Sequence, residues 1–312
     1  MKNKVLIIGR NFHPDGKETA ATIAEALRPY LAKDGVETEL VLFKDILFDI
    51  SNEDTKVLNA RTGQDLAKAG AVLMTNWFSH ASVRKDMALT LALYFAEKGV
   101  PVFNTESLHS RSTSKLSQML VAVQQGVPIA RTVFCLSLDH LMAYLHAEQF
   151  AAPFIFKDAQ ASRGKGNFLL DSIDAVAGHK EAHSEQAPFM AQALIDSEGA
   201  DYRFFVVGGE TRVIIKRIGS GDSHLNNTSA GASTQLIPLE EMDAKAMECV
   251  RTMSNALHRE VTGIDIMFDR SSGMPYFLEA NPIPQIATGS NVDIKLTALA
   301  QGMREAIGKK EA

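Results

Sequence analysis

The first third of the chain alternates between short apolar runs and segments of helical periodicity. Val5–Ile8 is a run of four apolar residues, which predicts a buried strand. The next segment carries Ile23, Leu27 and Leu31 at helical spacing until Gly35 ends it. Three further strands and one helix are expected, with the strands over 36–42, 71–75 and 99–104 and the helix over 83–98. Strands that alternate with helices favour a parallel sheet with crossover helices.

The pattern changes after residue 105. Helices are expected over 113–125 and 138–148, and short strands over 130–134, 154–157 and 168–170. From residue 188 longer strands are expected, over 190–195, 202–207, 211–218, 261–268 and 275–279, and tight turns separate several of them. Such consecutive strands predict an antiparallel sheet, so the fold class is α/β followed by α+β. We expect an N-terminal α/β domain (1–105), a central unit (106–187) and a C-terminal unit (188–312).

Composition and charge exclude several classes of protein. With 46% hydrophobic residues, 22% charged residues and 10 prolines, the chain is neither disordered nor collagen-like. Its net charge of −5 gives no reason to expect a nucleic-acid partner, and no apolar run approaches the roughly 18–20 residues of a membrane span. Two cysteines supply neither a disulfide framework nor a four-cysteine zinc site. The first apolar run is too short for a signal peptide, so we expect a soluble, cytoplasmic protein without nucleic-acid or membrane partners.

Familiar catalytic and metal-binding motifs fail on spacing or on content. Gly9 and Gly16 resemble the ends of a phosphate loop, but six residues separate them where four are needed, and no serine or threonine follows Lys17. His179 and His183 stand four residues apart in a polar run with no third ligand, which favours a solvated helix face over a zinc site. No Gly-x-Ser-x-Gly elbow is present. Acyl-enzyme chemistry therefore has no support.

Two segments carry lysines that are suited to binding phosphate. Lys115 stands in the first turn of a predicted helix, where free N–H groups attract an anion, although a surface lysine is the simpler interpretation. Lys157 ends an apolar strand and precedes the loop Ser162–Asn167, which contains two cations and two glycines. Gly164 and Gly166 let the backbone approach phosphate oxygens. An ordinary hairpin turn explains the glycines equally well but explains the two cations poorly.

Charged residues also interrupt the predicted C-terminal strands. Asp201 and Arg203 are two residues apart and share one face of a strand, where they either form a cross-strand ion pair or point into a cleft. Arg217 ends the next strand, which places a second guanidinium near the first.

The sharpest local signal lies in the last two predicted strands. Asp265 and Glu279 interrupt otherwise apolar strands, where an unpaired carboxylate is strongly unfavourable. Asn281 shares the strand face of Glu279. Two carboxylates and an amide oxygen are hard ligands that suit Mg²⁺, which takes its remaining ligands from phosphates. The alternative is a buried acid that Lys216 or Arg217 neutralises.

Six segments taken together resemble the ATP-grasp ligases, most closely the RimK-like and bacterial glutathione-synthetase-like branches. In chain order they are Arg111–Lys115, Lys157 with its glycine loop, Gln192–Ile195, Asp201–Gly208, Gly263–Asp265 and Glu279–Pro282. The resemblance covers about residues 106–307; each segment alone is weak, but six in the family's order are specific. It implies an N-terminal pre-ATP-grasp domain followed by a two-subdomain ATP-grasp fold with an antiparallel C-terminal sheet.

The resemblance also implies ATP as the cofactor and assigns its contacts. The implied nucleotide-binding residues are Lys115, Lys157, Ser162, Gly164, Gly166, Gln192, Ala193, Leu194, Asp201 and Asn226. Within this set the two lysines would hold the α- and β-phosphates, and Ser162–Asn167 would form a lid loop over them. The backbone at residues 193 and 194 would contact adenine with Gln192 beside it, and Asp201 would bind the ribose hydroxyls.

The implied activity is the joining of a carboxylate to an amine through an acyl phosphate, with small molecules or peptides as substrates. Arg203 and Arg217 would contact the γ-phosphate and the acyl phosphate. Asp265, Glu279 and Asn281 would bind two Mg²⁺ ions, with Glu279 bridging and Mn²⁺ able to substitute. Relatives are often dimers or tetramers, so the resemblance leaves a homo-oligomer open.

Departures from the family's pattern leave the substrates open. Ala193 stands where many relatives have an acidic residue, His224 where arginine is frequent, and Pro284-Gln285 replaces a common Pro-Gly. The loop Thr228–Gly231 also lacks the His-Arg-Gly-Gly of the RimK-like branch. Two alternatives to a ligase remain, namely a synapsin-type ATP-binding module without ligase turnover and an ATP-grasp enzyme of another reaction type. The full set of arginines and metal ligands argues against the first, because nucleotide binding alone does not need them all.

Overall fold

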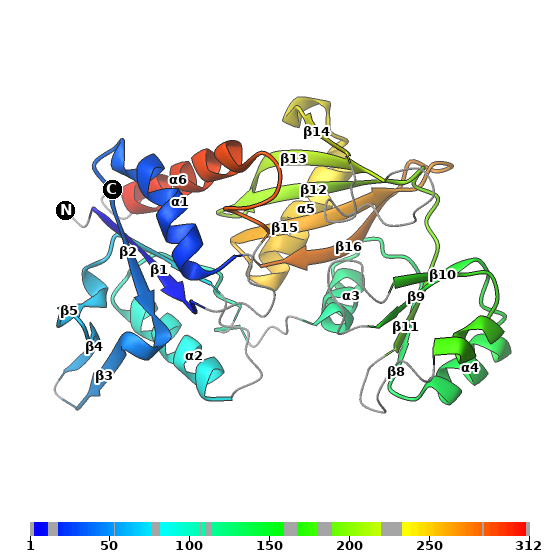
Figure 1. Cartoon of the computed structure of the whole chain (residues 1–312), viewed down its shortest axis with the longest axis horizontal. Helices are drawn as coiled ribbons and strands as arrows, with labels where there is room; N and C mark the ends of the chain where they lie inside the picture. The colour runs from blue at the N-terminus through cyan, green and yellow to red at the C-terminus, as the bar shows by residue number, and fades with distance from the viewer. Residues whose placement is uncertain are drawn as a thin grey trace.

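A computed structural model describes most of the chain. The described residues are 3–11, 18–52, 54–75, 82–106, 108–109, 114–158, 167–179, 189–219, 233–282 and 284–309. They form an elongated molecule with three sheet-containing regions along its long axis (Figure 1). A region built mainly from the first hundred residues lies at one end, a five-stranded antiparallel sheet lies in the middle, and a four-stranded antiparallel sheet lies at the other end.

The N-terminal region contains the parallel sheet that the alternating pattern predicts. Its strand order is β2-β1-β6-β7, with β1 at Lys4–Gly9, β2 at Glu37–Leu42, β6 at Ala71–Met74 and β7 at Val102–Phe103. The helices are α1 (Ala20–Ala32) and α2 (Ser82–Glu97). The sequence did not predict a small antiparallel sheet made of β3 (Ile46–Ile50), β4 (Thr55–Asn59) and β5 (Gln64–Asp65), flanked by the short helices η1 (Phe43–Asp45) and η2 (Leu66–Lys68).

The four-stranded sheet follows in the sequence. Its order is β10-β9-β11-β8, with β8 at Thr132–Cys135, β9 at Phe154–Asp158, β10 at Asn167–Leu170 and β11 at Phe189–Ala193. Helix α4 (Leu138–Ala147) and the short helix η3 (Asp174–His179) pack on it. Buried Phe154 and Phe156 of β9 lie in the same apolar cluster as Leu141 and Leu145 of α4, so this sheet has a core of its own.

The five-stranded sheet carries the long C-terminal strands. Its order is β14-β13-β12-β15-β16, with β12 at Ala200–Val207, β13 at Glu210–Ile218, β14 at Ser233–Ile237, β15 at Val261–Phe268 and β16 at Pro275–Asn281. The remaining helices are α3 (Lys115–Gln124), η5 (Leu239–Glu241), α5 (Ala244–Leu257) and α6 (Val292–Lys309). All pairs in this sheet are antiparallel, as predicted.

The two faces of the five-stranded sheet have different partners. Phe204 and Val206 of β12 face one way and pack with apolar residues of α5 and α3. Phe205 and Val207 face the other way and join a core with α1, α6 and the N-terminal sheet. Because alternate residues of a strand share a face, Asp201 and Arg203 lie on this second face, further along the same strand. We call it the site face.

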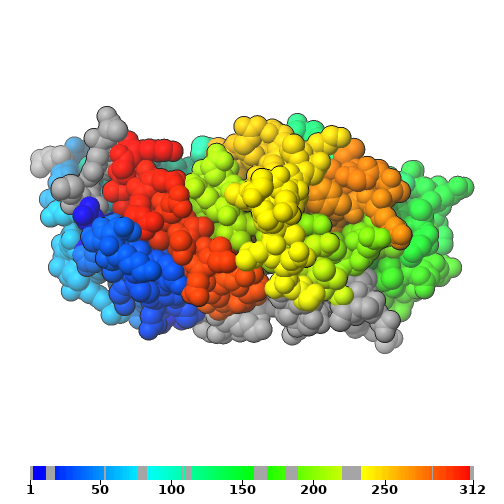
Figure 2. Space-filling model, turned by 90° about the horizontal axis from the view of Figure 1, so that it is seen from above, coloured from blue at the N-terminus to red at the C-terminus, as the bar shows by residue number. Residues whose placement is uncertain are grey.

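Helix α6 connects the C-terminal sheet with the N-terminal region. It packs against α1, β12 and β13, and Leu299 and Met303 are buried in the core that they share. In Figure 2 the residues of α6 lie between the N-terminal residues and those of the five-stranded sheet. Gly302 permits this approach, because a Cβ atom at this position would lie 2.3 Å from Cγ1 of Val207. The proposed boundaries near residues 105 and 187 stay a prediction.

Among the residues that the structure describes, no helix is both long enough and apolar enough to span a membrane.

Candidate functional site

The charged half of the site face is built from cross-strand partners on four adjacent strands. Asp201 of β12 is the register partner of Arg217 of β13. Arg203 of β12 is the partner of Asp265 of β15, and Asp265 in turn is the partner of Glu279 of β16. The antiparallel register therefore brings together five residues that lie as much as 78 positions apart in the sequence.

Within this group the arginines and aspartates form a buried network. Nε and Nη2 of Arg217 donate to the two carboxylate oxygens of Asp201 at 2.6 and 2.7 Å. Nε and Nη2 of Arg203 donate to Asp265 at 2.8 and 2.7 Å. Nη2 of Arg217 also lies 3.0 Å from Oδ2 of Asp265, which links the two pairs. The predicted alternative of a buried acid neutralised by Arg217 is thus present at Asp265, whereas Lys216 lies on the opposite face over the ring of Tyr202.

Glu279 has different partners. Its Oε2 lies 3.5 Å from Nζ of Lys115, and its Oε1 accepts a hydrogen bond of 2.9 Å from the amide of Asn281. A β-bulge in β16 aims this carboxylate, because the register with β15 shifts between Asp265 and Ile266 and leaves Leu278 as an extra residue. Phe277 and Ala280 both face the core, and the extra residue between them lets Glu279 and Asn281 point to the site face.

The four-stranded sheet contributes a lysine from the other side of the site. Nζ of Lys157 on β9 donates to Oε1 of Gln192 on β11 at 2.7 Å, and the Gln192 amide donates to Oγ1 of Thr132 at 3.0 Å. Ala193 ends β11 with its N–H bonded to the carbonyl of Arg131, and Leu194 is 42% exposed.

Burial and neighbouring charge shift several pKa values in this region. Burial and, to a smaller extent, the charge of the nearby Lys115 lower the pKa of Lys157 to about 8, although Glu279 opposes both. Burial raises the pKa of Asp201 to about 6 although Arg217 pulls it down. Burial also opposes ionisation of Asp265, but the two arginines outweigh it and hold its pKa below the usual value. The charge of Lys115 likewise outweighs desolvation at the Glu279 carboxyl and holds its pKa below the usual value.

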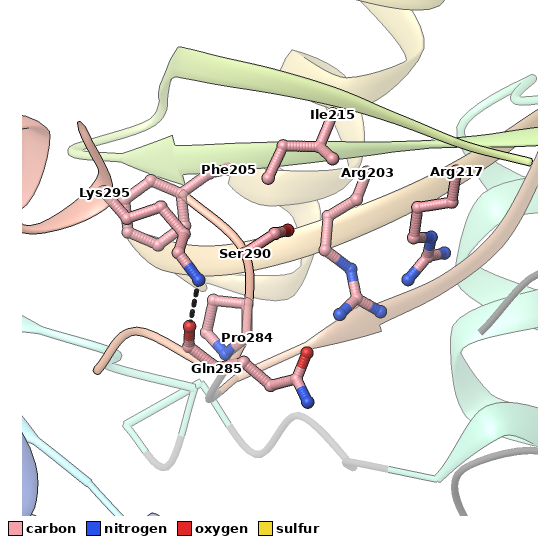
Figure 3. Close-up of a pocket in the computed structure, with 8 residues that line it drawn as sticks. All are labelled: Arg203, Phe205, Ile215, Arg217, Pro284, Gln285, Ser290 and Lys295. Atoms are coloured by element: carbon pink, nitrogen blue, oxygen red, sulfur yellow. Dashed lines mark hydrogen bonds between the residues drawn. The ribbon is translucent and has the colours of Figure 1, made fainter. Parts of the chain in front are cut away.

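A pocket opens beside the arginines (Figure 3). It is a small pocket that is partly open to solvent. Strands β12 and β13, the segment between β16 and α6, and the first turn of α6 line it with Arg203, Phe205, Ile215, Arg217, Pro284, Gln285, Ser290 and Lys295. Lys295 is 4% exposed and donates to the carbonyls of Gln285 and Thr288, the latter at 2.8 Å. Burial lowers its pKa to about 8, which Glu18 opposes.

The structure gathers most of the predicted site residues. Arg203, Arg217, Asp201, Asp265, Glu279 and Asn281 share the site face, Lys115 reaches Glu279 from α3, and Lys157 and Gln192 pair on the four-stranded sheet. Ser162, Gly164, Gly166 and Asn226 lie outside the described residues. The sequence reasoning missed Lys295 and Glu18, although one signal was available, because Lys295 occupies a buried position in a helix that is otherwise apolar on that side.

The donor atoms on the site face fit Mg²⁺. Among the described residues no group of three or more His, Cys, Asp or Glu side chains has a metal-binding arrangement, so a complete protein cage does not exist there. Asp265 and Glu279 supply carboxylate oxygens and Asn281 an amide oxygen. Asp265 already accepts three contacts from arginines, and a carboxylate offers about four lone-pair sites. A small donor set of hard oxygens suits Mg²⁺, which keeps water and phosphate ligands.

Comparison with known proteins places this site in a family. A family profile described as a RimK-like ATP-grasp domain matches residues 112–307. The chain belongs to the RimK-like ATP-grasp family. The matched segment contains every strand of the four-stranded and five-stranded sheets and all of the site residues named above except Glu18. The resemblance drawn from the six sequence segments is therefore confirmed for its RimK-like branch.

Curated and solved relatives agree with this assignment. The RimK-like chain is 32% identical over 178 residues to the probable alpha-L-glutamate ligase 1 of Pseudoalteromonas atlantica. The match covers 56% of this chain and 57% of that relative. The match thus spans less than two thirds of the relative's length. The ATP-grasp ligase PsnB, complexed with a minimal precursor, Mg and ADP, superposes with a TM-score of 0.66 at 16% identity over 98% of both chains. The macrocyclase MdnC from Microcystis aeruginosa, bound with the precursor peptide MdnA, gives 0.62 at 13% identity over 96% of this chain and 99% of that one. At these identities the two structures show the fold alone, and this confirms the predicted fold class.

Proposed function

We propose that the protein is an ATP- and Mg²⁺-dependent carboxylate–amine ligase that works through an acyl phosphate and releases ADP and phosphate. The convergence of Arg203 and Arg217 on Asp265, the register partner of Glu279, carries this proposal. Phosphoryl transfer needs little covalent help from a protein but much positioning and neutralisation of charge. Two guanidiniums beside two carboxylates supply both, and nucleotide binding alone does not require them.

Lys115 and Lys157 are assigned to the α- and β-phosphates. They approach from different elements, the first turn of α3 and strand β9, and each lies near enough to Glu279 to interact with its charge. Anionic oxygens between the two lysines would offset both their mutual repulsion and the desolvation of the Lys157 ammonium. A polyphosphate supplies such oxygens.

The adenine and ribose assignments rest on the edge of β11 and on Asp201. The backbone at Ala193 and Leu194 lies at the end of β11, beside the Gln192 that holds Lys157. Both carboxylate oxygens of Asp201 accept hydrogen bonds from Arg217, so ribose hydroxyls that bind there would donate to the same two oxygens.

The proposed reaction has two steps. A carboxylate oxygen of the first substrate attacks the γ-phosphorus of ATP, the bond to the β–γ bridging oxygen breaks, and ADP leaves. The amine nitrogen of the second substrate then attacks the acyl carbon, phosphate leaves, and the nitrogen loses a proton. Arg203 and Arg217 stabilise the negative charge on the transferring group in both steps. No nucleophilic side chain is required.

Asp265, Glu279 and Asn281 are the side chains that would hold two Mg²⁺ ions, through carboxylate and amide oxygens. When bound, Mg²⁺ neutralises charge on the nucleotide's phosphates. In the structure these side chains are held by Arg203, Lys115 and one another, so they are positioned before any ion binds.

The pocket beside Arg203 and Arg217 is the proposed place for the substrates. It carries three cationic side chains together with the apolar surfaces of Phe205, Ile215 and Pro284, which suits a carboxylate joined to an apolar carbon skeleton. The curated relative is described as a glutamate ligase, and both solved neighbours bind a precursor. These descriptions support small molecules or peptides as both carboxylate and amine.

A phosphate-release screen with product masses tests the proposal. The protein is incubated with Mg²⁺, ATP and pairs of carboxylates and amines, including amino acids and short peptides. A ligase releases phosphate only when both partners are present, and the product mass equals the sum of the two less one water. Phosphate release that ignores the amine, or nucleotide binding without any release, contradicts the proposal and favours the other ATP-grasp activities.

A further inference from the structure

Four side chains from separate parts of the chain form hydrogen bonds with the backbone of residues 280–282, at the end of β16. The carbonyl of Ala280 accepts a hydrogen bond from Nη1 of Arg259, and its N–H donates to Oε1 of Gln118 at 2.7 Å. Oγ1 of Thr262 donates to the next carbonyl, of Asn281, at 2.8 Å. The carbonyl after that, of Pro282, accepts from the amide of Asn104 at 3.3 Å.

Among these four side chains, Arg259 carries the largest desolvation cost, because it is a buried cation. It stands between α5 and β15, its side chain is 1% exposed, and its charge is offset by Glu106, which is fully buried with Nε and Oε1 3.4 Å apart. Within the described residues, both oxygens of Glu106 and the Nε and Nη2 atoms of Arg259 have no hydrogen-bond partner. A buried pair with so few hydrogen bonds is a poor source of stability, because the desolvation of the two charges is not fully offset.

The place where Arg259 binds the backbone suggests a role for the Arg259–Glu106 pair other than stabilising the fold. Ala280 lies between Glu279 and Asn281, immediately after the β-bulge that turns Glu279 toward the site face. Side chains of a strand follow the orientation of its peptide planes, so a donor on this carbonyl and an acceptor on this N–H set the direction of both neighbours. Gln118 adds a link to α3, the helix whose first residue, Lys115, contacts Glu279.

We infer that Arg259, charge-balanced by Glu106, is a positioning residue that holds Ala280 so that Glu279 and Asn281 present their oxygens together to a divalent cation. The inference rests on the proposed function for the identity of the cation but not for the geometry. Supporting groups of this kind commonly change metal affinity by about 10- to 100-fold when they are removed.

A double substitution separates positioning from charge balance. Arg259→Met alone leaves the Glu106 carboxyl buried without its cation and is expected to destabilise the fold. Arg259→Met with Glu106→Gln removes both charges, so the thermal midpoint recovers while the donor to Ala280 stays absent. Arg259→Lys keeps a cation and a hydrogen-bond donor, so it should retain part of the Mn²⁺ affinity that the methionine variants lose. A matched control is Arg212→Met with Glu305→Gln, which removes an ion pair of 2.6 Å between β13 and α6, remote from β16.

The readout is Mn²⁺ binding in the presence of ADP, measured from the electron paramagnetic resonance signal of free Mn²⁺, together with the midpoint temperature of unfolding. The inference predicts that the Arg259→Met/Glu106→Gln protein binds Mn²⁺ at least tenfold more weakly than the wild type at a similar midpoint, while the control pair binds like the wild type. Where turnover is measured, the KM for Mg²⁺ rises more than kcat falls. Equal Mn²⁺ affinity in the double variant and the wild type overturns the inference and leaves the proposed function intact. A wild type that binds no Mn²⁺ overturns the metal assignment and the inference together.

Discussion

Arg217 and Asp201 face one another as register partners on neighbouring strands, and the guanidinium donates to both carboxylate oxygens while only 3% of the arginine is exposed. The same guanidinium also reaches Asp265. One buried cation therefore serves two buried anions. Removing it leaves both carboxylates with less compensation than burial demands.

Arg217→Met should consequently lower the free energy of unfolding by about 3–5 kcal/mol, the usual cost of breaking a buried ion pair. Urea denaturation at pH 7 measures this. The matched control is Arg212→Met, whose pair with Glu305 is partly open to solvent, and there the loss should stay near or below about 1 kcal/mol. Similar losses at both positions would mean that the Arg217 network is no more than an ordinary surface pair.

Nucleotide affinity should fall as the pH rises through about 8. Burial lowers the pKa of Lys157 to about 8 from a usual value of 10.5, so its ammonium is charged below that pH and neutral above it. A neutral amine loses its attraction for phosphate. The measurement is the Kd of ADP with Mg²⁺ between pH 6.5 and 9.5.

Two variants assign this pH dependence. Lys157→Arg keeps a cation throughout and should flatten the profile. Lys295 has a similar pKa of about 8 and therefore serves as a control. Lys295→Met should leave the profile unchanged, because Lys295 lines the pocket and is not one of the proposed phosphate-binding lysines. A profile that survives Lys157→Arg would assign the titration to another group.

The effect of pH on stability has the opposite sign. Burial of the Lys157 ammonium lowers stability by its full amount below pH 8, and this loss disappears between pH 8 and 10.5.

Glu279→Ala should abolish ligase turnover and weaken Mn²⁺ binding while the protein stays folded. The carboxylate is the register partner of Asp265, and its side chain is still 29% exposed, so its loss opens no large cavity. Turnover, Mn²⁺ titration and the midpoint of thermal unfolding together test this. Glu241→Ala on the exposed η5 helix is the control and should behave as the wild type. Near-normal turnover of Glu279→Ala across a range of Mg²⁺ concentrations would show that the metal site lies elsewhere.

Two glycines of α6 offer a matched pair for stability. Gly302→Ala places a Cβ atom 2.3 Å from Cγ1 of Val207 and should destabilise the fold by about 1–3 kcal/mol, as overpacking does. Gly308→Ala meets no atom within 4 Å in the same helix and should be neutral or stabilise by about 0.5–1 kcal/mol through helix propensity. Chemical denaturation of both variants checks this, and equal effects would contradict the packing of α6 on β12.

Local periodicity was enough to predict the elements and much of the site. The alternation of Asp201, Arg203, Phe205 and Val207 along one strand face is visible in the sequence, and so is the placement of Glu279 and Asn281 on one face. The partners across the sheet were only partly visible. Asp201 was considered a partner of Arg203, but the register pairs it with Arg217 on the next strand, because strand pairing is decided by turns and packing and not by spacing within one strand.

Features that depend on distant contacts were not predicted. The bulge at Leu278 has no sequence signature of its own, since it carries no glycine, and it is recognised only from the register with β15. Strand β5 has only two residues, too few for periodicity to be informative, and the five-residue strands β3 and β4 show no strict alternation of apolar and polar residues. Lys295 and Glu106 are isolated charges whose partners, Glu18 and Arg259, lie more than 150 residues away.

The packing of α6 against α1 has a consequence for how the protein is made. Leu299 and Met303 complete the core that contains Val5 and Ile7, and nearly 300 residues separate the two pairs in the chain. On the ribosome, at roughly 5–20 residues per second, the N-terminal strands emerge many seconds before that helix is synthesised. During this interval α1 alone covers one side of the parallel sheet, so the apolar surface that α6 buries in the complete fold is still exposed on the nascent chain.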